Sequence, residues 1–85
     1  MPAKIFNLTK KPHKQISRLP LRIQDKIDRA FETIKQNPIS GAKLGGELSG
    51  NYKFRVGDYR IVYKFNAKES RVDVLKIEHR QGVYK

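Results

Sequence analysis

Alternating hydrophobic and polar positions are clearest in the middle of the chain. From Tyr52 to Val56, and again from Tyr59 to Phe65, aromatic and β-branched residues alternate with polar ones, and Gly57-Asp58 separates the two runs. A period of two is typical of a half-buried strand, and a two-residue break that contains glycine is typical of a hairpin. The pattern therefore predicts two antiparallel strands joined by a tight turn.

The predicted hairpin separates its charges from its apolar side chains. Residues two apart on a strand share a face, so Phe54 and Val56 point to one side while Lys53 and Arg55 point to the other. If the apolar rows pack on the core, the opposite face carries fixed cations, and such a face suits phosphate. The second strand adds two cations to it, Arg60 and Lys64.

The chain before the hairpin predicts a short strand and two helices. The strand spans Lys4 to Leu8, and a basic helix follows from Lys10 to Ser17, with Thr9 offering its hydroxyl as N-cap. A second helix spans Leu21 to Asn37, because apolar residues recur there at spacings of three and four and form one buried stripe. Ile39 to Gly50, rich in glycine, is predicted to be a connection into the sheet.

A last strand is predicted from Arg71 to Glu78, and it is apolar on both faces. A strict period of two sends Val72 and Val74 to one face and Leu75 and Ile77 to the other. Strands that are apolar on both faces are usually interior ones. This strand is therefore expected inside the sheet, next to the hairpin.

These elements predict one α+β domain covering residues 1–85. In the order β-α-α-β-β-β, two N-terminal helices pack on one face of a small, mainly antiparallel sheet, and the other face stays available for binding or chemistry. No internal repeat or second domain is visible in the pattern.

The charge of the chain narrows the class of partner. Nineteen Lys and Arg residues (Lys+Arg 19) stand against eight acidic ones (Asp+Glu 8), for a net charge of +11 at pH 7. The cations are spread along the folded body, and a field of this sign favours polyanions such as nucleic acid. The sequence has no cysteine and only two histidines, so neither a metal site nor a cofactor is expected. The N-terminus has no signal-peptide pattern, and we expect a cytoplasmic protein.

The last residues add candidate chemistry to the cationic strands. The final strand runs into His79-Arg80 and then Val83-Tyr84, so an imidazole, a further cation and a phenol come at the end of the sheet. We expect His79 and Arg80 to come within reach of Arg55 and Arg60 on the neighbouring strands.

At this point the sequence resembles a known family over nearly its whole length. The resemblance is to the RelE/ParE superfamily of toxins, on the RelE side. It is carried by Lys43-Leu44, Leu48-Ser49-Gly50, Tyr52-Lys53-Phe54-Arg55, Gly57-Asp58-Tyr59-Arg60-Ile61-Val62-Tyr63, and the terminal His79-Arg80 and Val83-Tyr84. The Tyr-Arg-Ile-Val-Tyr strand is common to the superfamily, and the tail is the more specific part.

The resemblance implies an endoribonuclease that enters the A site of the small ribosomal subunit and cuts mRNA there. Lys53 and Arg55 match the family's pair of cations that act near the attacking 2′-hydroxyl and the phosphate. Arg60 matches the arginine that stabilises the transition state. A cognate antitoxin is implied as the inhibitor of the toxin.

The resemblance also assigns roles to the tail. Arg80 matches the arginine assigned to protonating the leaving 5′-oxygen, and Tyr84 matches the tyrosine that stacks on a base. His79 matches a histidine that is an acid or base candidate in many relatives. The turn between Arg55 and Tyr59 is shorter than in some relatives, and we expect no further C-terminal helix.

The same chemistry follows from the residues themselves. Cleavage through the 2′-hydroxyl of RNA needs a proton acceptor, a proton donor and positive charge around a phosphorane-like centre, and cations can supply that charge without a metal. His79 has the only kind of side chain here whose ordinary pKa lies near neutrality, so it ranks beside Arg80 for the acid role. Tyr84 offers a ring for a base, a contact worth ~1–3 kcal/mol.

Three functions remain open on the sequence. The first is the ribosome-dependent nuclease, whose basic body would also hold ribosomal RNA phosphates. The second is a ParE-like toxin that binds and poisons DNA gyrase, and the third is a catalytically inactive module that binds RNA or a partner. His79-Arg80 with Tyr84 favours the nuclease. Under either toxin hypothesis an acidic, partly disordered antitoxin is the expected partner, because a strongly basic body attracts an anionic segment that folds on binding.

Overall fold

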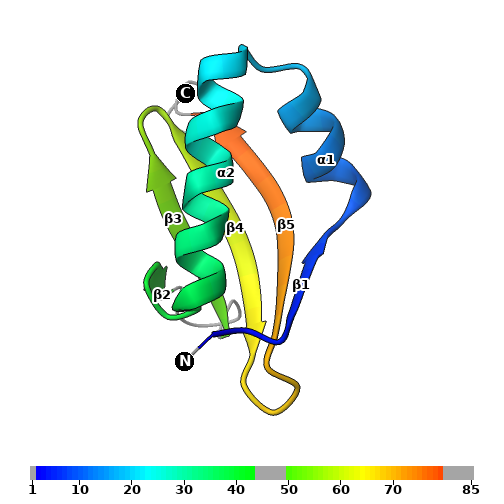
Figure 1. Ribbon diagram of the computed structural model, residues 1–85, viewed down its shortest axis with the longest axis vertical. Coiled ribbons are helices and arrows are strands. Elements are labelled where there is room, and N and C mark those ends of the chain that lie inside the picture. Colours follow the sequence, from blue (N-terminus) through cyan, green and yellow to red (C-terminus); the bar gives the residue numbers. More distant parts are fainter. Residues whose placement is uncertain (1, 44–49, 80–85) are drawn as a thin grey trace.

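The order of the elements is strand, two helices and four strands in the computed structural model, which describes residues 2–43 and 50–79 (Figure 1). Each predicted helix and strand is present within one or two residues of its expected bounds. The bounds are β1 (Ile5–Leu8), α1 (Lys10–Ser17), α2 (Leu21–Gln36), β2 (Ala42–Lys43), β3 (Asn51–Val56), β4 (Tyr59–Asn66) and β5 (Arg71–His79).

The strands form one five-stranded mixed sheet in the order β1-β5-β4-β3-β2. β1 pairs with β5 in parallel, and the other neighbours are antiparallel. The predicted α+β class is confirmed, as is the interior position of β5. The short strand β2 was not expected. It lies in the segment predicted to be a connection, and it extends the sheet beyond β3.

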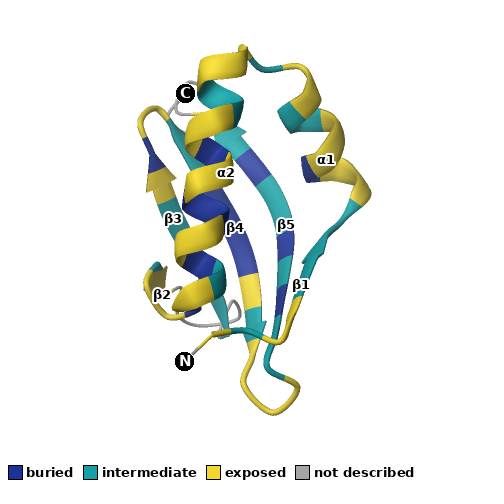
Figure 2. Ribbon diagram, viewed as in Figure 1, coloured by how far each residue is buried: buried dark blue, intermediate teal, exposed yellow. Residues whose placement is uncertain are grey.

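The core lies between α2 and the sheet. Ile27 and Ile34 are seven residues apart on one face of α2, and both are fully buried. Ile61 and Tyr63 of β4 are fully buried as well. Spacings of three and four put the apolar residues of α2 on one side, which is why the helix covers the sheet instead of standing in solvent. Figure 2 shows the buried stretches of α2 lying over those of the sheet, with the far side of the helix exposed.

A bulge in β5 corrects the predicted faces of that strand. The register with β4 changes from Val62 opposite Lys76 to Tyr63 opposite Val74, which leaves Leu75 as an extra residue. An extra residue reverses the alternation beyond it. The prediction that Ile77 faces away from Val74 is therefore wrong, because both residues are buried in the same core.

Helix α1 is fastened to β5 by two side chains. Thr9 stands at the N-cap position, but its hydroxyl makes no capping bond and instead donates to the carbonyl oxygen of Val74 at 3.0 Å, so the predicted capping role is wrong. The Oε1 atom of Gln15 accepts the N–H of Ile77 at 2.9 Å. β1 pairs with β5 only as far as Val74. Beyond that residue, α1 lies along β5 in place of a paired strand.

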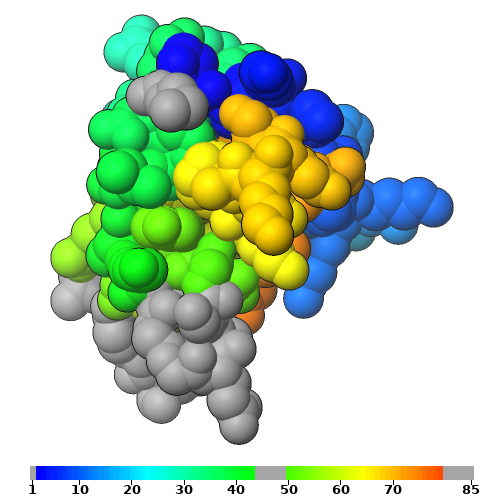
Figure 3. All heavy atoms as spheres, turned by 90° about the horizontal axis from the view of Figure 1, so that it is seen from below, coloured from blue at the N-terminus to red at the C-terminus, as the bar shows by residue number. Residues whose placement is uncertain are grey.

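The N-terminal residues close the other end of the sheet. The backbone N–H of Lys4 donates to the carbonyl oxygen of Ser70 at 2.8 Å, and the Ser70 hydroxyl donates to the carbonyl of Pro2 at 3.4 Å. Figure 3, which looks onto this end, shows the N-terminal residues in blue next to the turn between β4 and β5. The β3–β4 turn lies at the opposite end, where Gly57 adopts the positive φ of 57° that a tight hairpin favours.

Candidate functional site

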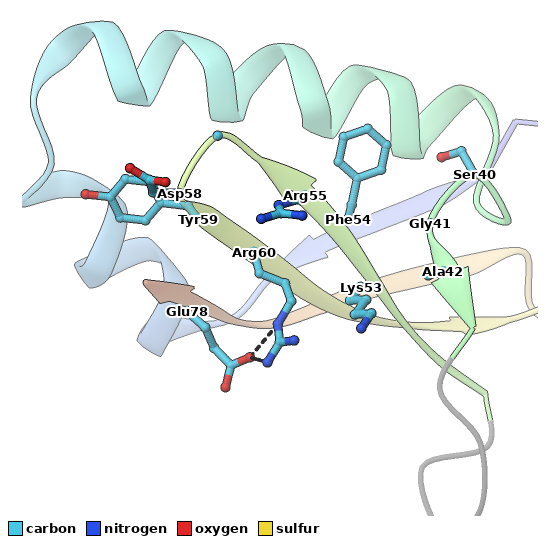
Figure 4. A pocket seen from close by; sticks show the side chains of 11 residues that line it. Ser40, Gly41, Ala42, Lys53, Phe54, Arg55, Asp58, Tyr59, Arg60 and Glu78 are labelled. Carbon is cyan, nitrogen blue, oxygen red and sulfur yellow. Dashed lines mark hydrogen bonds and ion pairs between the residues drawn. The ribbon is translucent and has the colours of Figure 1, made fainter. Parts of the chain in front are cut away.

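The sheet face away from the helices carries a group of cations. Phe54 points toward α2 in Figure 4, whereas Lys53 and Arg60 point to the opposite side. Arg55 pairs with Arg60 across the hairpin, and Lys53 pairs with Val62. Because cross-strand partners share a face, the structure brings Lys53, Arg55 and Arg60 together, as predicted. We call this side of the sheet the open face.

One row across the open face places two arginines next to a glutamate. Arg55 of β3 lies opposite Arg60 of β4, and Arg60 lies opposite Glu78 of β5. Arg60 donates to Oε1 of Glu78 from Nε at 2.9 Å and from Nη2 at 2.6 Å. Like charges placed directly opposite destabilise a strand pair, so the glutamate offsets the repulsion between the two arginines.

Glu78 is a site residue that the sequence reasoning missed. Besides Arg60 it contacts Lys76, whose Nζ lies 3.1 Å from Oε2, and its side chain is only 22% exposed. Partial burial alone would raise the pKa of Glu78, but the hydrogen bonds and charges of Arg60 and Lys76 outweigh it and lower the pKa below its ordinary value. The available signal was the alternation of Lys76 and Glu78 with Ile77, which predicts that the two charges share a face.

A pocket of about 400 Å³ opens between this row and the edge of the sheet. Lys53, Arg55, Arg60 and Glu78 line it together with the turn residues Gly57 and Asp58 and with the segment Ser40–Ala42 (Figure 4). Among the described lining residues, Asp58 and Glu78 are the only carboxylates. The described lining therefore has three cations and two carboxylates, and its walls come from several different strands.

The wall of the pocket at residues 40–42 is held against β3 by a buried tyrosine. The hydroxyl of Tyr63 donates to the carbonyl oxygen of Pro38 at 2.7 Å and accepts the N–H of Gly41 at 3.1 Å. A Cβ atom at Gly41 would come within 2.7 Å of the Lys53 carbonyl oxygen, so the close approach requires glycine. Burial raises the pKa of Tyr63, which keeps the phenol neutral.

His79 faces the other side of the sheet. It pairs with Tyr59, and the two rings meet edge to face with centroids 4.7 Å apart. It lines a second pocket with Lys11 and Lys14 of α1 and with Arg18, the residue that follows this helix. The expectation that the strand end would bring His79 toward Arg60 is not met, because His79 follows Glu78 by one residue and points to the helix side.

Two predicted site residues, Arg80 and Tyr84, lie outside the described residues. Their assigned roles stay predictions. Within the described part of the chain, the geometry supports Lys53, Arg55 and Arg60 as one cluster, with His79 separated from it by the sheet.

Asp73 and Glu78, both carboxylates of the open face, predict a loss of stability in acid. Partial burial opposes ionisation of Asp73, but Asn7 and Arg71 hydrogen-bond to it and lower its pKa below the ordinary 3.8. The pKa of Glu78 is likewise lowered below its ordinary 4.5. Each carboxylate stabilises the fold when the pH is above its ordinary pKa. This contribution is lost as the pH falls through the lowered pKa of the folded state, because the unfolded chain then binds more protons. We expect the urea concentration at the unfolding midpoint to decrease as the pH is lowered below 4.5. The decrease should be smaller in a Glu78→Gln/Asp73→Asn variant. An equal pH dependence in both proteins would contradict this.

Comparison with known proteins identifies the class. The family model for the ParE toxin of type II toxin-antitoxin systems, parDE, matches residues 7–84. The chain therefore belongs to the RelE/ParE superfamily of toxins of type II toxin–antitoxin systems. Neither described helix combines the length and the apolar character needed to cross a membrane.

Individual relatives carry RelE-type names. The chain is 30% identical over 74 residues to Toxin RelG of Mycobacterium tuberculosis, covering 85% of each protein. It is 31% identical over 74 residues to Toxin RelE of the same organism, covering 85% of this chain and 76% of that protein. A chain in the crystal structure of the RelBE2 toxin–antitoxin complex from M. tuberculosis superimposes with a TM-score of 0.81 at 28% identity, over 94% of this chain and 93% of that one.

Proposed function

We propose that this toxin is a ribosome-dependent endoribonuclease that cuts mRNA in the ribosomal A site and so inhibits translation. The observation that supports the proposal most directly is the cluster of Lys53, Arg55 and Arg60 in one pocket on the open face. The relatives with RelE-type names favour the same activity.

The proposed reaction uses the 2′-hydroxyl of the message itself as the nucleophile. Its oxygen loses the 2′ proton to a base and forms a bond to the neighbouring phosphorus. The bond from phosphorus to the 5′-oxygen breaks as that oxygen takes up a proton, which leaves a cyclic phosphate. Arg60 binds the non-bridging oxygens as negative charge builds up, and Lys53 with Arg55 holds the phosphate beside the attacking oxygen. Cations take the role that a metal has in other nucleases, so no cofactor is required.

The remaining roles fall to residues at the end of β5. Arg80 or His79 donates the proton to the leaving oxygen, and Tyr84 stacks on a base of the A-site codon. His79 opens to the helix side of the sheet, which makes Arg80 the better candidate for a donor beside Arg60. Both assignments are ours to test by substitution.

We also propose two macromolecular partners besides the message. Ribosomal RNA is one, because the net charge of +11 gives the protein a strong and salt-dependent attraction for phosphate. A cognate acidic antitoxin is the other. The M. tuberculosis chain that superimposes on this one comes from the RelBE2 toxin–antitoxin complex. The surplus of cations on this chain suits an anionic segment.

Primer extension on a defined message in a purified translation system tests the proposal. We expect new 5′ ends confined to the A-site codon in the presence of ribosomes, and none with naked RNA. Arg80→Ala should abolish the cuts. An intact message under conditions in which the protein arrests growing cells would contradict the nuclease.

The second candidate is a gyrase poison. It is favoured by one observation, the match of residues 7–84 to the family model described for ParE toxins. A supercoiling assay with purified gyrase separates the two functions, since a gyrase poison should inhibit supercoiling and keep most of its toxicity after alanine replaces Arg60 and Arg80. A protein that is silent in both assays would be an inactive binding module.

A further inference from the structure

Glu78 holds the guanidinium of Arg60 by one particular edge. Both hydrogen bonds, from Nε at 2.9 Å and Nη2 at 2.6 Å, go to Oε1, while Oε2 of the same carboxylate lies 3.1 Å from Nζ of Lys76. A guanidinium has five N–H donors in a rigid fork. The Nε and Nη2 edge is therefore occupied by the glutamate, and the edge formed by Nη1 and the second hydrogen of Nη2 remains for another anion.

The remaining edge has the geometry that a phosphate needs. Two parallel N–H donors on Nη1 and Nη2 match two oxygens of a phosphodiester, the same bidentate arrangement that arginine makes with carboxylates. Arg60 lies in the pocket with Lys53 and Arg55, so an anion on its free edge is next to both. Glu78 and a phosphate can thus bind Arg60 together, each on its own edge.

The sheet makes this contact rigid. Arg60 and Glu78 are cross-strand partners in the β4–β5 ladder, and their side chains are only 27% and 22% exposed. Arg55 of β3, the strand on the side of β4 away from β5, is also a cross-strand partner of Arg60. Its like charge would push a freely moving Arg60 side chain away from the pocket. The carboxylate counters this repulsion and fixes the direction in which the guanidinium points.

We propose that Glu78 is a positioning residue: it holds Arg60 by the Nε–Nη2 edge so that the Nη1–Nη2 edge is presented, already oriented, to the phosphate of the message. The inference rests on the proposed nuclease function and adds to it a residue that acts through Arg60. A carboxylate bound by two cations is a weak proton acceptor, so Glu78 serves orientation and leaves proton transfer to other groups.

Single-turnover cleavage of A-site message measures the effect. A misplacement of about 1 Å can cost about 10²-fold in rate, so we expect Glu78→Ala to lower the maximal rate by about that factor. The toxin concentration at half-maximal rate should change little. Glu78→Gln keeps an acceptor oxygen for Arg60 and should lose less, about 10-fold by the same argument.

Asp73→Asn is the matched control. Asp73 lies on the same strand and the same face, carries the same charge, and pairs with Lys64 instead of Arg60. It should cut at close to the wild-type rate. Equal losses for Asp73→Asn and Glu78→Gln would mean that net charge, not positioning, is responsible. A Glu78→Gln protein that cuts faster or binds the ribosome more tightly would also overturn the inference, because Glu78 would then compete with phosphate for Arg60.

A readout without ribosomes separates this inference from the proposed function. In ¹⁵N NMR of arginine side chains, the Nε–H of Arg60 should exchange slowly in the wild-type protein and fast in Glu78→Ala, which removes the acceptor oxygen. Added inorganic phosphate should shift the Arg60 resonances while the slow exchange of Nε–H persists. Loss of the slow exchange on phosphate binding would overturn the inference. A wild-type toxin that cuts no message but keeps this NMR behaviour would overturn the nuclease and leave the positioning of Arg60 intact.

Discussion

Replacing Arg60 by alanine is expected to lower the rate of message cleavage by about 10²–10³-fold, the usual cost of removing one fixed donor aimed at developing negative charge. Arg60 lies between Arg55 and Glu78 in one row of the sheet, so its guanidinium is both charged and oriented before the message binds. In the proposed reaction it acts when the phosphorus carries an additional oxygen, and its loss should therefore affect the maximal rate more than binding. Single-turnover primer extension at saturating toxin measures this.

Lys64→Ala is the control for Arg60→Ala. Lys64 lies on the same strand and the same face, and it is exposed, so its removal lowers the net charge equally without emptying the pocket. Cleavage by Lys64→Ala should stay within a few-fold of wild type. Arg60→Lys tests orientation separately, because it keeps the charge and loses the bidentate edge. Equal activity of Arg60→Ala and Lys64→Ala, with both proteins folded by circular dichroism, would sink the assignment of Arg60.

The cationic cluster was predictable because it depends only on local alternation. Lys53, Arg55 and Arg60 fall on one face as soon as the hairpin is placed, and the two-residue turn at Gly57 fixes which residues lie opposite each other. Helix α2 was equally predictable, since its apolar residues repeat at the helical period. Both features are encoded within a few residues of chain.

The face of the last strand was not predictable in the same way. A strict period of two carried through from Val74 would put Ile77 and His79 on the open face and Glu78 toward the helices. The bulge at Leu75 reverses this, and so it turns His79 toward Tyr59 and brings Glu78 to Arg60. No local pattern marks the bulge. It is fixed by the packing of Val74 and Ile77 into one core, which depends on the whole sheet.

The strand β2 shows the same limit. Ala42 and Lys43 carry no strand pattern of their own, and they pair with β3 because Gly41 allows the backbone to come close to Lys53. The bond partners of Tyr63 in this segment lie 22 and 25 residues away in sequence. The alternation of β4 puts Tyr63 on the same face as Ile61, but the contact that its hydroxyl makes belongs to the tertiary structure.

Tyr63→Ala is expected to lower the free energy of unfolding by about 3–5 kcal/mol, the usual cost of removing a large buried aromatic ring. Tyr63 is fully buried, stacks on Tyr52 with ring centroids 5.4 Å apart, and joins the segment after α2 to the sheet through its hydroxyl. For a small domain whose whole stability is about 5–15 kcal/mol, such a loss leaves a substantial unfolded fraction. Urea unfolding followed by circular dichroism measures it.

Tyr63→Phe separates the hydroxyl from the ring. It keeps the stacked pair but leaves the N–H of Gly41 and the carbonyl of Pro38 without their partner, which should cost about 1–3 kcal/mol. Tyr52→Phe, which alters the neighbouring ring and leaves both bonds in place, is the control and should cost less. If Tyr63→Phe is as stable as Tyr52→Phe, the hydroxyl does not hold this wall of the pocket. If it is less stable and also cuts more slowly with Lys53, Arg55 and Arg60 all present, then the placement of residues 40–42 against β3 contributes to the site as well as to the fold.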